Sequence, residues 1–173
     1  MNSIIAIAFS TAAMAFLTIA VGIRLFIDRS REMRERRVHP QTVSTSRQMA
    51  ERLQSVQSAD NFRNLFEVPV LFYALCATVL ATQLASPALA IGAWLFVALR
   101  VAHSVIHCTY NKVMHRFATF IASMLVLAVL WILFVVQLLT HAQSERRSHQ
   151  CFSMSRGWNP LAPMISGRCR VEF

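Results

Sequence analysis

Apolar residues fill four long windows of the chain, and polar segments separate these windows. The windows cover residues 4–27, 65–85, 88–108 and 117–139. Each reaches the length of about 20 residues that a helix needs to cross a bilayer. None shows the strict alternation of polar and apolar residues that marks the strands of a membrane barrel. The pattern predicts four membrane-spanning helices and therefore an all-α, integral membrane four-helix bundle.

The composition agrees with this prediction. Of the 173 residues, 55% are hydrophobic and 14% are charged, a balance typical of a small multi-pass membrane protein. We expect residues 1–141 to form the membrane domain. Residues 142–173 are rich in Arg, Ser, Gly and Pro, so we expect them to form a loosely ordered tail. The first window is longer than the core of a secretory signal, and we expect it to be retained as a helix.

The net charge of +9 raises the question of nucleic-acid binding. The basic residues are concentrated in the segment DRSREMRERR (28–37) and in the tail, without interleaved aromatic residues or a recognition motif, so we expect no nucleic-acid partner. They fit the positive-inside rule instead, which places the loop after the first window in the cytoplasm. The loop with Lys112 and Arg116 then lies on the same side. We expect a multi-pass membrane protein with both of these loops in the cytoplasm.

The chain has four cysteines, and no two of them form a CxxC pair. Neither a zinc ribbon nor a redox motif is therefore indicated. Cys76 and Cys108 lie in membrane windows, where cysteine acts as a small apolar residue. Cys151 and Cys169 in the tail would be able to pair in an oxidising compartment.

The third window carries a stripe of polar residues along one helical face. Arg100, His103, His107 and Asn111 follow the spacing i, i+3, i+7 and i+11. A fixed charge inside a membrane segment costs about 2.5 to 3.5 kcal/mol on insertion scales. The stripe must therefore face the interior of a bundle, a cavity or a bound anion.

A second polar cluster begins the second window. Arg63 and Glu67 have the i, i+4 spacing of an intrahelical ion pair, and Asn64 shares the face of Glu67. Pro69 follows and removes one backbone hydrogen bond, so we expect a kink near these groups. Arg24 is the only charged residue of the first window, and its position near the window's end suits an arginine that reaches the membrane interface.

Three interpretations of the two clusters remain open from the residues alone. Together they would form a cationic funnel for a small anionic ligand, because guanidinium groups bind carboxylates in a bidentate manner. His103 and His107 have the i, i+4 spacing that lets two imidazoles share a metal ion, although the segment lacks the internal Glu of a zincin motif and Arg100 would repel a cation. The histidines would otherwise serve only as hydrogen-bonded groups inside a bundle.

The segments RNLFEVP (63–69) and RVAHSVIHCTYNKVMHR (100–116) resemble the MAPEG family, the membrane-associated proteins in eicosanoid and glutathione metabolism. The resemblance covers the four windows. It is nearer to the bacterial members of the family, which implies a bacterial inner membrane. It implies a homotrimer of four-helix protomers that binds glutathione between subunits near the cytoplasmic side. From the residues themselves we expect no metal site. The resemblance further implies glutathione contacts at Arg24, Arg63, Asn64, Glu67, His103 and Arg116, to which the stripe adds Arg100. Arg116 resembles the arginine that holds the cofactor sulfur as a thiolate, the nucleophilic form of a thiol.

The sequence departs from the family pattern at three positions. His107 stands where the eicosanoid enzymes have a tyrosine, and Phe117 and Phe120 stand where a prostaglandin-type member has a serine and a tyrosine. His107 would be able to replace the tyrosine as a hydrogen-bond donor in catalysis. We expect a glutathione-dependent transferase or peroxidase that acts on lipophilic electrophiles. The alternative is a non-catalytic binding or assembly module with the same fold.

Overall fold

Four long helices make up the part of the chain that the structure describes. The computed structural model describes residues 2–37, 56–109 and 112–156. The helices are α1 (Ser3–Glu35), α3 (Val56–Thr82), α4 (Pro87–Cys108) and α5 (Val113–Arg156). All four are long and apolar enough to cross a membrane. The prediction of four spans in an all-α bundle is therefore confirmed.

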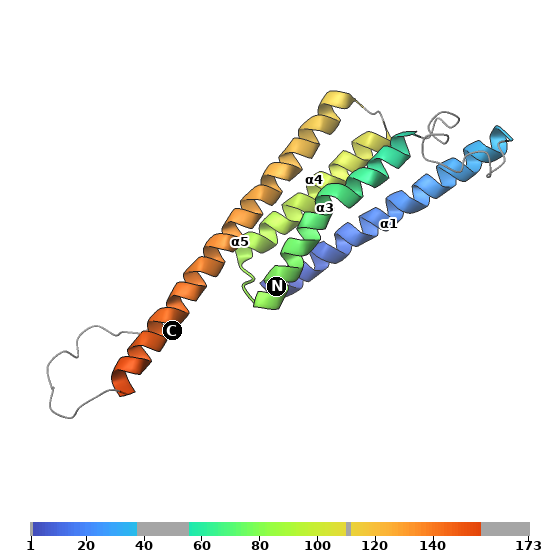
Figure 1. Cartoon of the computed structure of the whole chain (residues 1–173). Helices are drawn as coiled ribbons and strands as arrows, with labels where there is room; N and C mark the ends of the chain where they lie inside the picture. Colours follow the sequence, from blue (N-terminus) through green and yellow to red (C-terminus); the bar gives the residue numbers. More distant parts are fainter. Residues whose placement is uncertain (1, 38–55, 110–111, 157–173) are drawn as a thin grey trace, which may run out of the picture. The chain divides into compact units, whose positions relative to one another are not determined.

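Helices α1, α3 and α4 lie side by side, as Figure 1 shows. The start of α5 is connected to α4 by hydrogen bonds between Arg116 and two histidines. The chain divides into two compact units, Met1–Phe134 and Val135–Phe173. The first unit contains three complete helices and the first half of α5, and it holds every site described below. The second unit contains the rest of α5, whose helical residues continue to Arg156.

The core of the first unit is built from one apolar face of each helix. Phe72 of α3 stacks on Phe96 of α4, with ring centroids 4.6 Å apart and ring planes 19° apart. Met14 of α1 is fully buried beside them in the same cluster, and Leu130 of α5 is also buried. Large apolar side chains also point outward, including Phe9, Phe16, Phe26, Met114 and Ile132. Such an outer surface is suited to lipid, because lipid tails do not penalise exposed apolar groups.

Local sequence signals explain where the helices begin and end. The Ser86 side chain accepts a hydrogen bond from the Leu89 backbone N–H at 3.3 Å, and Pro87 occupies the first turn of α4. Helix α3 continues through Pro69, which is buried inside it. The short connection between α3 and α4 begins at Gln83, whose φ of 58° turns the chain away from α3.

Helices α1 and α5 continue well past the ends of the apolar windows that predicted them. The windows end at residues 27 and 139, whereas α1 reaches Glu35 and α5 reaches Arg156. No glycine or proline lies between these points, so nothing breaks the helix where the composition turns polar. The structure thus differs from the expected loosely ordered tail at residues 142–156. Asn111, the last residue of the predicted stripe, lies outside the described residues.

Candidate functional site

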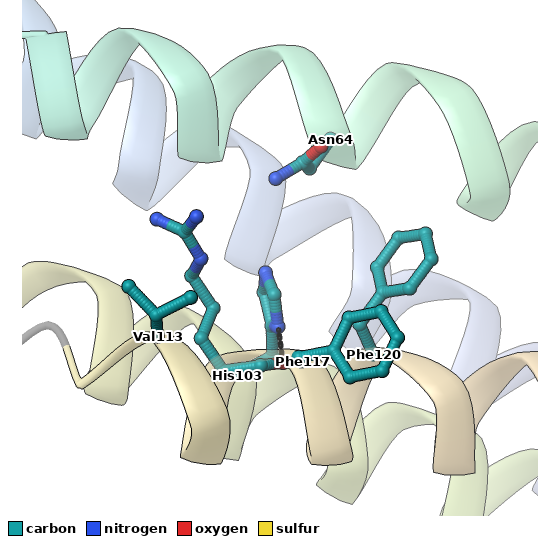
Figure 2. A pocket seen from close by; sticks show the side chains of 6 residues that line it. Asn64, His103, Val113, Phe117 and Phe120 are labelled. Atoms are coloured by element: carbon teal, nitrogen blue, oxygen red, sulfur yellow. Dashed lines mark hydrogen bonds between the residues drawn. The ribbon is translucent and has the colours of Figure 1, made fainter.

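A small cavity opens near the start of α5. It has a volume of about 200 Å³ and is lined by Asn64, His103, Val113, Arg116, Phe117 and Phe120. Figure 2 shows Asn64 on α3 facing the aromatic side chains of α5 across this space. Residues from three helices therefore meet here, and three of them belong to the predicted site.

Arg116 is held in place by both histidines of the α4 stripe. Its Nη1 donates a hydrogen bond to Nε2 of His107 at 3.2 Å. Its backbone carbonyl accepts a hydrogen bond from Nδ1 of His103 at 3.1 Å, and it accepts a second one from Thr119 Oγ1 at 3.0 Å. A carbonyl can only accept, so the hydrogen of the neutral His103 ring is assigned to Nδ1. The first turn of α5 is thereby fastened to α4 at two points.

These contacts define the tautomers of the two buried histidines. His107 accepts at Nε2, so a neutral ring carries its hydrogen on Nδ1. His103 donates at Nδ1 and therefore keeps a lone pair on Nε2. His107 Nδ1 and His103 Nε2 are buried without hydrogen-bond partners among the described residues. One donor and one acceptor nitrogen thus remain for a ligand or for groups outside those residues.

Arg100 lies one helical turn deeper than His103. Its side chain is fully buried, and none of its three guanidinium nitrogens has a hydrogen-bond partner in the part of the chain that the structure describes. The rings of Phe96 and Phe120 lie over it, with centroids 5.4 Å and 5.3 Å from Cζ. Arg100 therefore points into the interior of the bundle, as the sequence predicted.

The remaining predicted residues do not line this cavity. Arg63 and Glu67 are both exposed on α3, and no ion pair joins these two described side chains. Arg24 lies on α1 and pairs with Asp28 at 3.6 Å. Within this single chain, the structure brings together Asn64, His103 and Arg116 around the cavity, with Arg100 and His107 buried close by.

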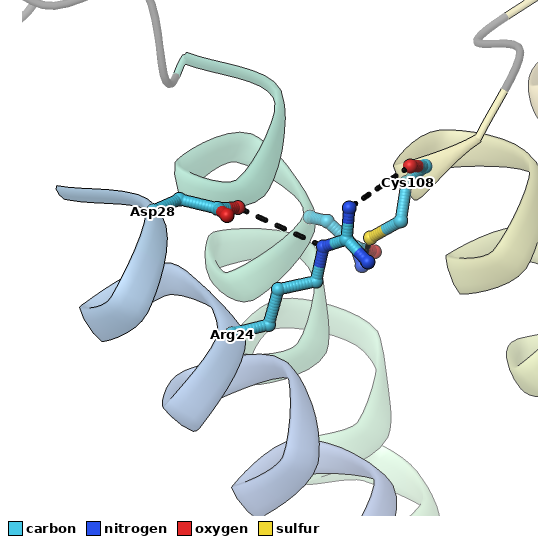
Figure 3. A network of polar contacts seen from close by, with 4 residues as sticks. Arg24, Asp28 and Cys108 are labelled. Carbon is cyan, nitrogen blue, oxygen red and sulfur yellow. Dashed lines mark hydrogen bonds and ion pairs between the residues drawn. The ribbon is translucent and has the colours of Figure 1, made fainter. Parts of the chain in front are cut away.

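Arg24 instead belongs to a polar network at the end of α4. Its Nη2 donates to the backbone carbonyl of Cys108 at 3.3 Å, as Figure 3 shows. This contact places a positive charge at the C-terminus of a helix, where the helix dipole favours it. The Nδ2 of Asn61 reaches the Cys108 thiol at 3.5 Å, and its Oδ1 accepts from Ser104 Oγ at 3.4 Å. The network connects α1, α3 and α4 near the cavity.

The sequence analysis did not identify two buried residues of this network. Asn61 is fully buried and Ser104 is nearly so. The available signal was their spacing, because Asn61 lies one turn before Asn64, and Ser104 follows His103 directly in the stripe. Cys108 was taken as an apolar filler, yet its thiol accepts a hydrogen bond in this network. No group of three or more histidine, cysteine, aspartate or glutamate side chains that could hold a metal ion occurs among the described residues.

The model of one protein family matches most of the chain. The match is to the MAPEG family, and it covers residues 7–136. The chain belongs to the MAPEG family. No match was found among curated proteins or among solved structures.

Membership of the MAPEG family, together with four apolar helices, establishes an integral multi-pass membrane protein. The matched residues include all of α3 and α4 and the start of α5, and hence every residue of the cavity. The differences noted from the sequence are concentrated at this cavity. Phe117 and Phe120 line it without a hydroxyl group, and His107 uses its Nε2 to hold Arg116. This MAPEG protein thus has a cavity with one aromatic wall and one cationic wall.

Proposed function

We propose that this protein is a glutathione-dependent transferase or peroxidase that acts on lipophilic electrophiles. The observation that carries the proposal is the position of Arg116, whose side chain lines the cavity and is fixed by His107 Nε2 at 3.2 Å. A guanidinium group near a thiol favours the thiolate, because the positive charge stabilises the negative one. Bound glutathione would supply this sulfur as the nucleophile.

The polar groups left over in the site fit glutathione. Arg100 offers donors for a carboxylate, and His103 Nε2 offers an acceptor for an amide or ammonium hydrogen. Asn64 on the opposite wall can bind an amide through both its donor and its acceptor. The aromatic wall formed by Phe117 and Phe120 suits a lipophilic second substrate arriving from the bilayer.

The size of the cavity supports a site shared between copies of the chain. Its volume of about 200 Å³ is below the range of about 300 to 1,000 Å³ typical of ligand clefts. One chain would thus hold only part of glutathione. The exposed Arg63 and Glu67, together with Arg24, would complete the site from a neighbouring subunit of a homotrimer. The end of the bundle at which α1 ends and α5 begins would face the cytoplasm, where glutathione is available.

Calorimetry in detergent tests the proposal directly. The protein is titrated with glutathione, and Arg116→Ala is compared with Arg34→Ala, a matched loss of one arginine on the exposed end of α1. We expect the native protein and Arg34→Ala to bind glutathione. Ultraviolet absorbance is measured on the same samples, and we expect Arg116→Ala to lose the absorbance of the glutathione thiolate. An absence of binding heat in the native protein would refute the proposal.

Turnover separates an enzyme from a binding module. A generic aryl halide is mixed with glutathione in the presence of the native protein or of Arg116→Ala. We expect the native protein to accelerate conjugation and Arg116→Ala to approach the uncatalysed rate. Binding of glutathione without acceleration of this reaction or of peroxide reduction would favour the non-catalytic module.

A further inference from the structure

The guanidinium group of Arg100 is buried without a hydrogen-bond acceptor among the described residues. Its guanidinium group carries five N–H donors in one plane, and all three nitrogens lack a hydrogen-bond partner among the described residues. The side chain is fully buried, so water cannot replace the missing acceptor. A buried charge without a partner is costly, and such groups normally mark a binding function inside a membrane segment.

The two aromatic rings over Arg100 do not supply the missing hydrogen-bond acceptors. Phe96 and Phe120 lie at 5.4 Å and 5.3 Å from Cζ and interact with the positive charge through their faces. A ring face cannot accept hydrogen bonds from all the N–H groups at the edge of the guanidinium plane. A carboxylate can accept two of them at once, because its two oxygens match the spacing of the donors.

The two rings differ in their freedom to move. Phe96 is fully buried, and it stacks on Phe72 in the core. Phe120 is only half-buried, and it lines the cavity. The ring of Phe120 therefore lies between the cavity and the guanidinium group of Arg100. Phe120 packs against the edge of the core, so a turn of its ring toward the cavity would uncover the guanidinium group while Phe96 stays stacked on Phe72.

We propose that Phe120 is a movable partition between the cavity and an inner carboxylate-binding subsite at Arg100. A ligand whose thiol end lies near Arg116 would extend a carboxylate past the displaced ring to Arg100. His103, whose ring centroid is 6.0 Å from that of Phe120, forms the other side of the passage. For glutathione as the ligand, this inference rests on the proposed function, whereas the partition itself does not.

Chemical labelling tests the partition without any glutathione. The purified protein in detergent is treated with phenylglyoxal, which modifies accessible arginines, and modification of Arg100 is followed by mass spectrometry. Phe120→Leu removes the ring and keeps an apolar side chain, and Phe96→Leu is the matched control on the other ring. We expect the modification rate at Arg100 to rise about tenfold in Phe120→Leu, through a larger open population, and to change little in Phe96→Leu.

Equal rates in Phe120→Leu and the native protein would overturn the partition, and so would an equal rise in Phe96→Leu. Circular dichroism and gel filtration establish that each variant is folded. Phe120→Met is used with the same expectation if Phe120→Leu is not folded. Arg34 provides an internal reference, because its exposed position makes its modification rate independent of both rings.

Ligand protection tests the carboxylate. Glutathione and its diethyl ester, which lacks both carboxylates, are added before the reagent, and succinate serves as a probe unrelated to thiol chemistry. We expect glutathione and succinate to slow the modification of Arg100, and the ester to have no effect. Equal protection by the ester would overturn the subsite. If the native protein binds no glutathione but succinate protects Arg100, the proposed function fails and the subsite stands.

Discussion

Replacing His107 by leucine removes the α4 side chain whose Nε2 accepts a hydrogen bond from Arg116. The Nη1–Nε2 distance of 3.2 Å describes a hydrogen bond from a charged donor, and His107 is almost fully buried. Hydrogen bonds to charged groups contribute about 1.5 to 3 kcal/mol. At 1.4 kcal/mol for each factor of ten, this corresponds to about 10- to 150-fold in an equilibrium constant.

We expect the lower end of this range, about tenfold weaker binding of glutathione. Arg116 is only half-buried, so water can replace part of the lost interaction. His107→Gln retains an acceptor oxygen within reach of Arg116 and should recover most of the affinity. The thiolate absorbance of bound glutathione should also fall from the native protein to His107→Gln and further to His107→Leu, because that signal depends on the position of the guanidinium group.

Titration calorimetry and ultraviolet absorbance in detergent provide the two measurements. His115→Leu is the matched control, since His115 is exposed beside Arg116 and lies outside the cavity lining. Native affinity and native thiolate absorbance in His107→Leu would refute the reasoning. A loss of binding in His107→Gln as large as in His107→Leu would show that the ring, and not its acceptor nitrogen, is what matters.

Two further predictions concern stability. A Cβ on Gly92 would overlap the Leu130 Cδ2 methyl, so Gly92→Ala should lower the free energy of unfolding by about 1 to 3 kcal/mol through overpacking of α4 against α5. Thermal unfolding in detergent measures this, and the double variant Gly92→Ala with Leu130→Ala should lose less stability than the sum of the two single losses. Asn61→Ala leaves the buried Ser104 hydroxyl without its side-chain acceptor, and should cost about 1 to 3 kcal/mol; an unchanged melting temperature would contradict the structural role of this network.

Some features of the site followed from spacing along a single helix. Arg100, His103 and His107 were assigned to one face of a helix, and all three are buried on that face. This prediction succeeded because helical periodicity fixes the direction of each side chain from its position alone. The cost of leaving a charge in lipid then determined that the face must point into the bundle.

Other features of the site depend on contacts between residues far apart in the sequence. Spacing alone favoured an Arg63–Glu67 ion pair, yet both side chains are exposed and unpaired with each other. An exposed ion pair of this kind contributes little, so spacing is a weak guide to whether it forms. The partners of Arg24 were likewise unpredictable, because one of them is a backbone carbonyl 84 residues away.

The amino-acid sequence by itself determined four apolar helices, their place in a membrane, the family, and the polar face of α4. Each of these depends on composition, periodicity or motif, which are properties of short segments. Only the tertiary structure decided that Arg116 binds His107, and that Phe120 covers Arg100 beside a cavity. The physical reason is that these contacts depend on how α5 packs against α4, and packing is set by the shapes of side chains from both helices together.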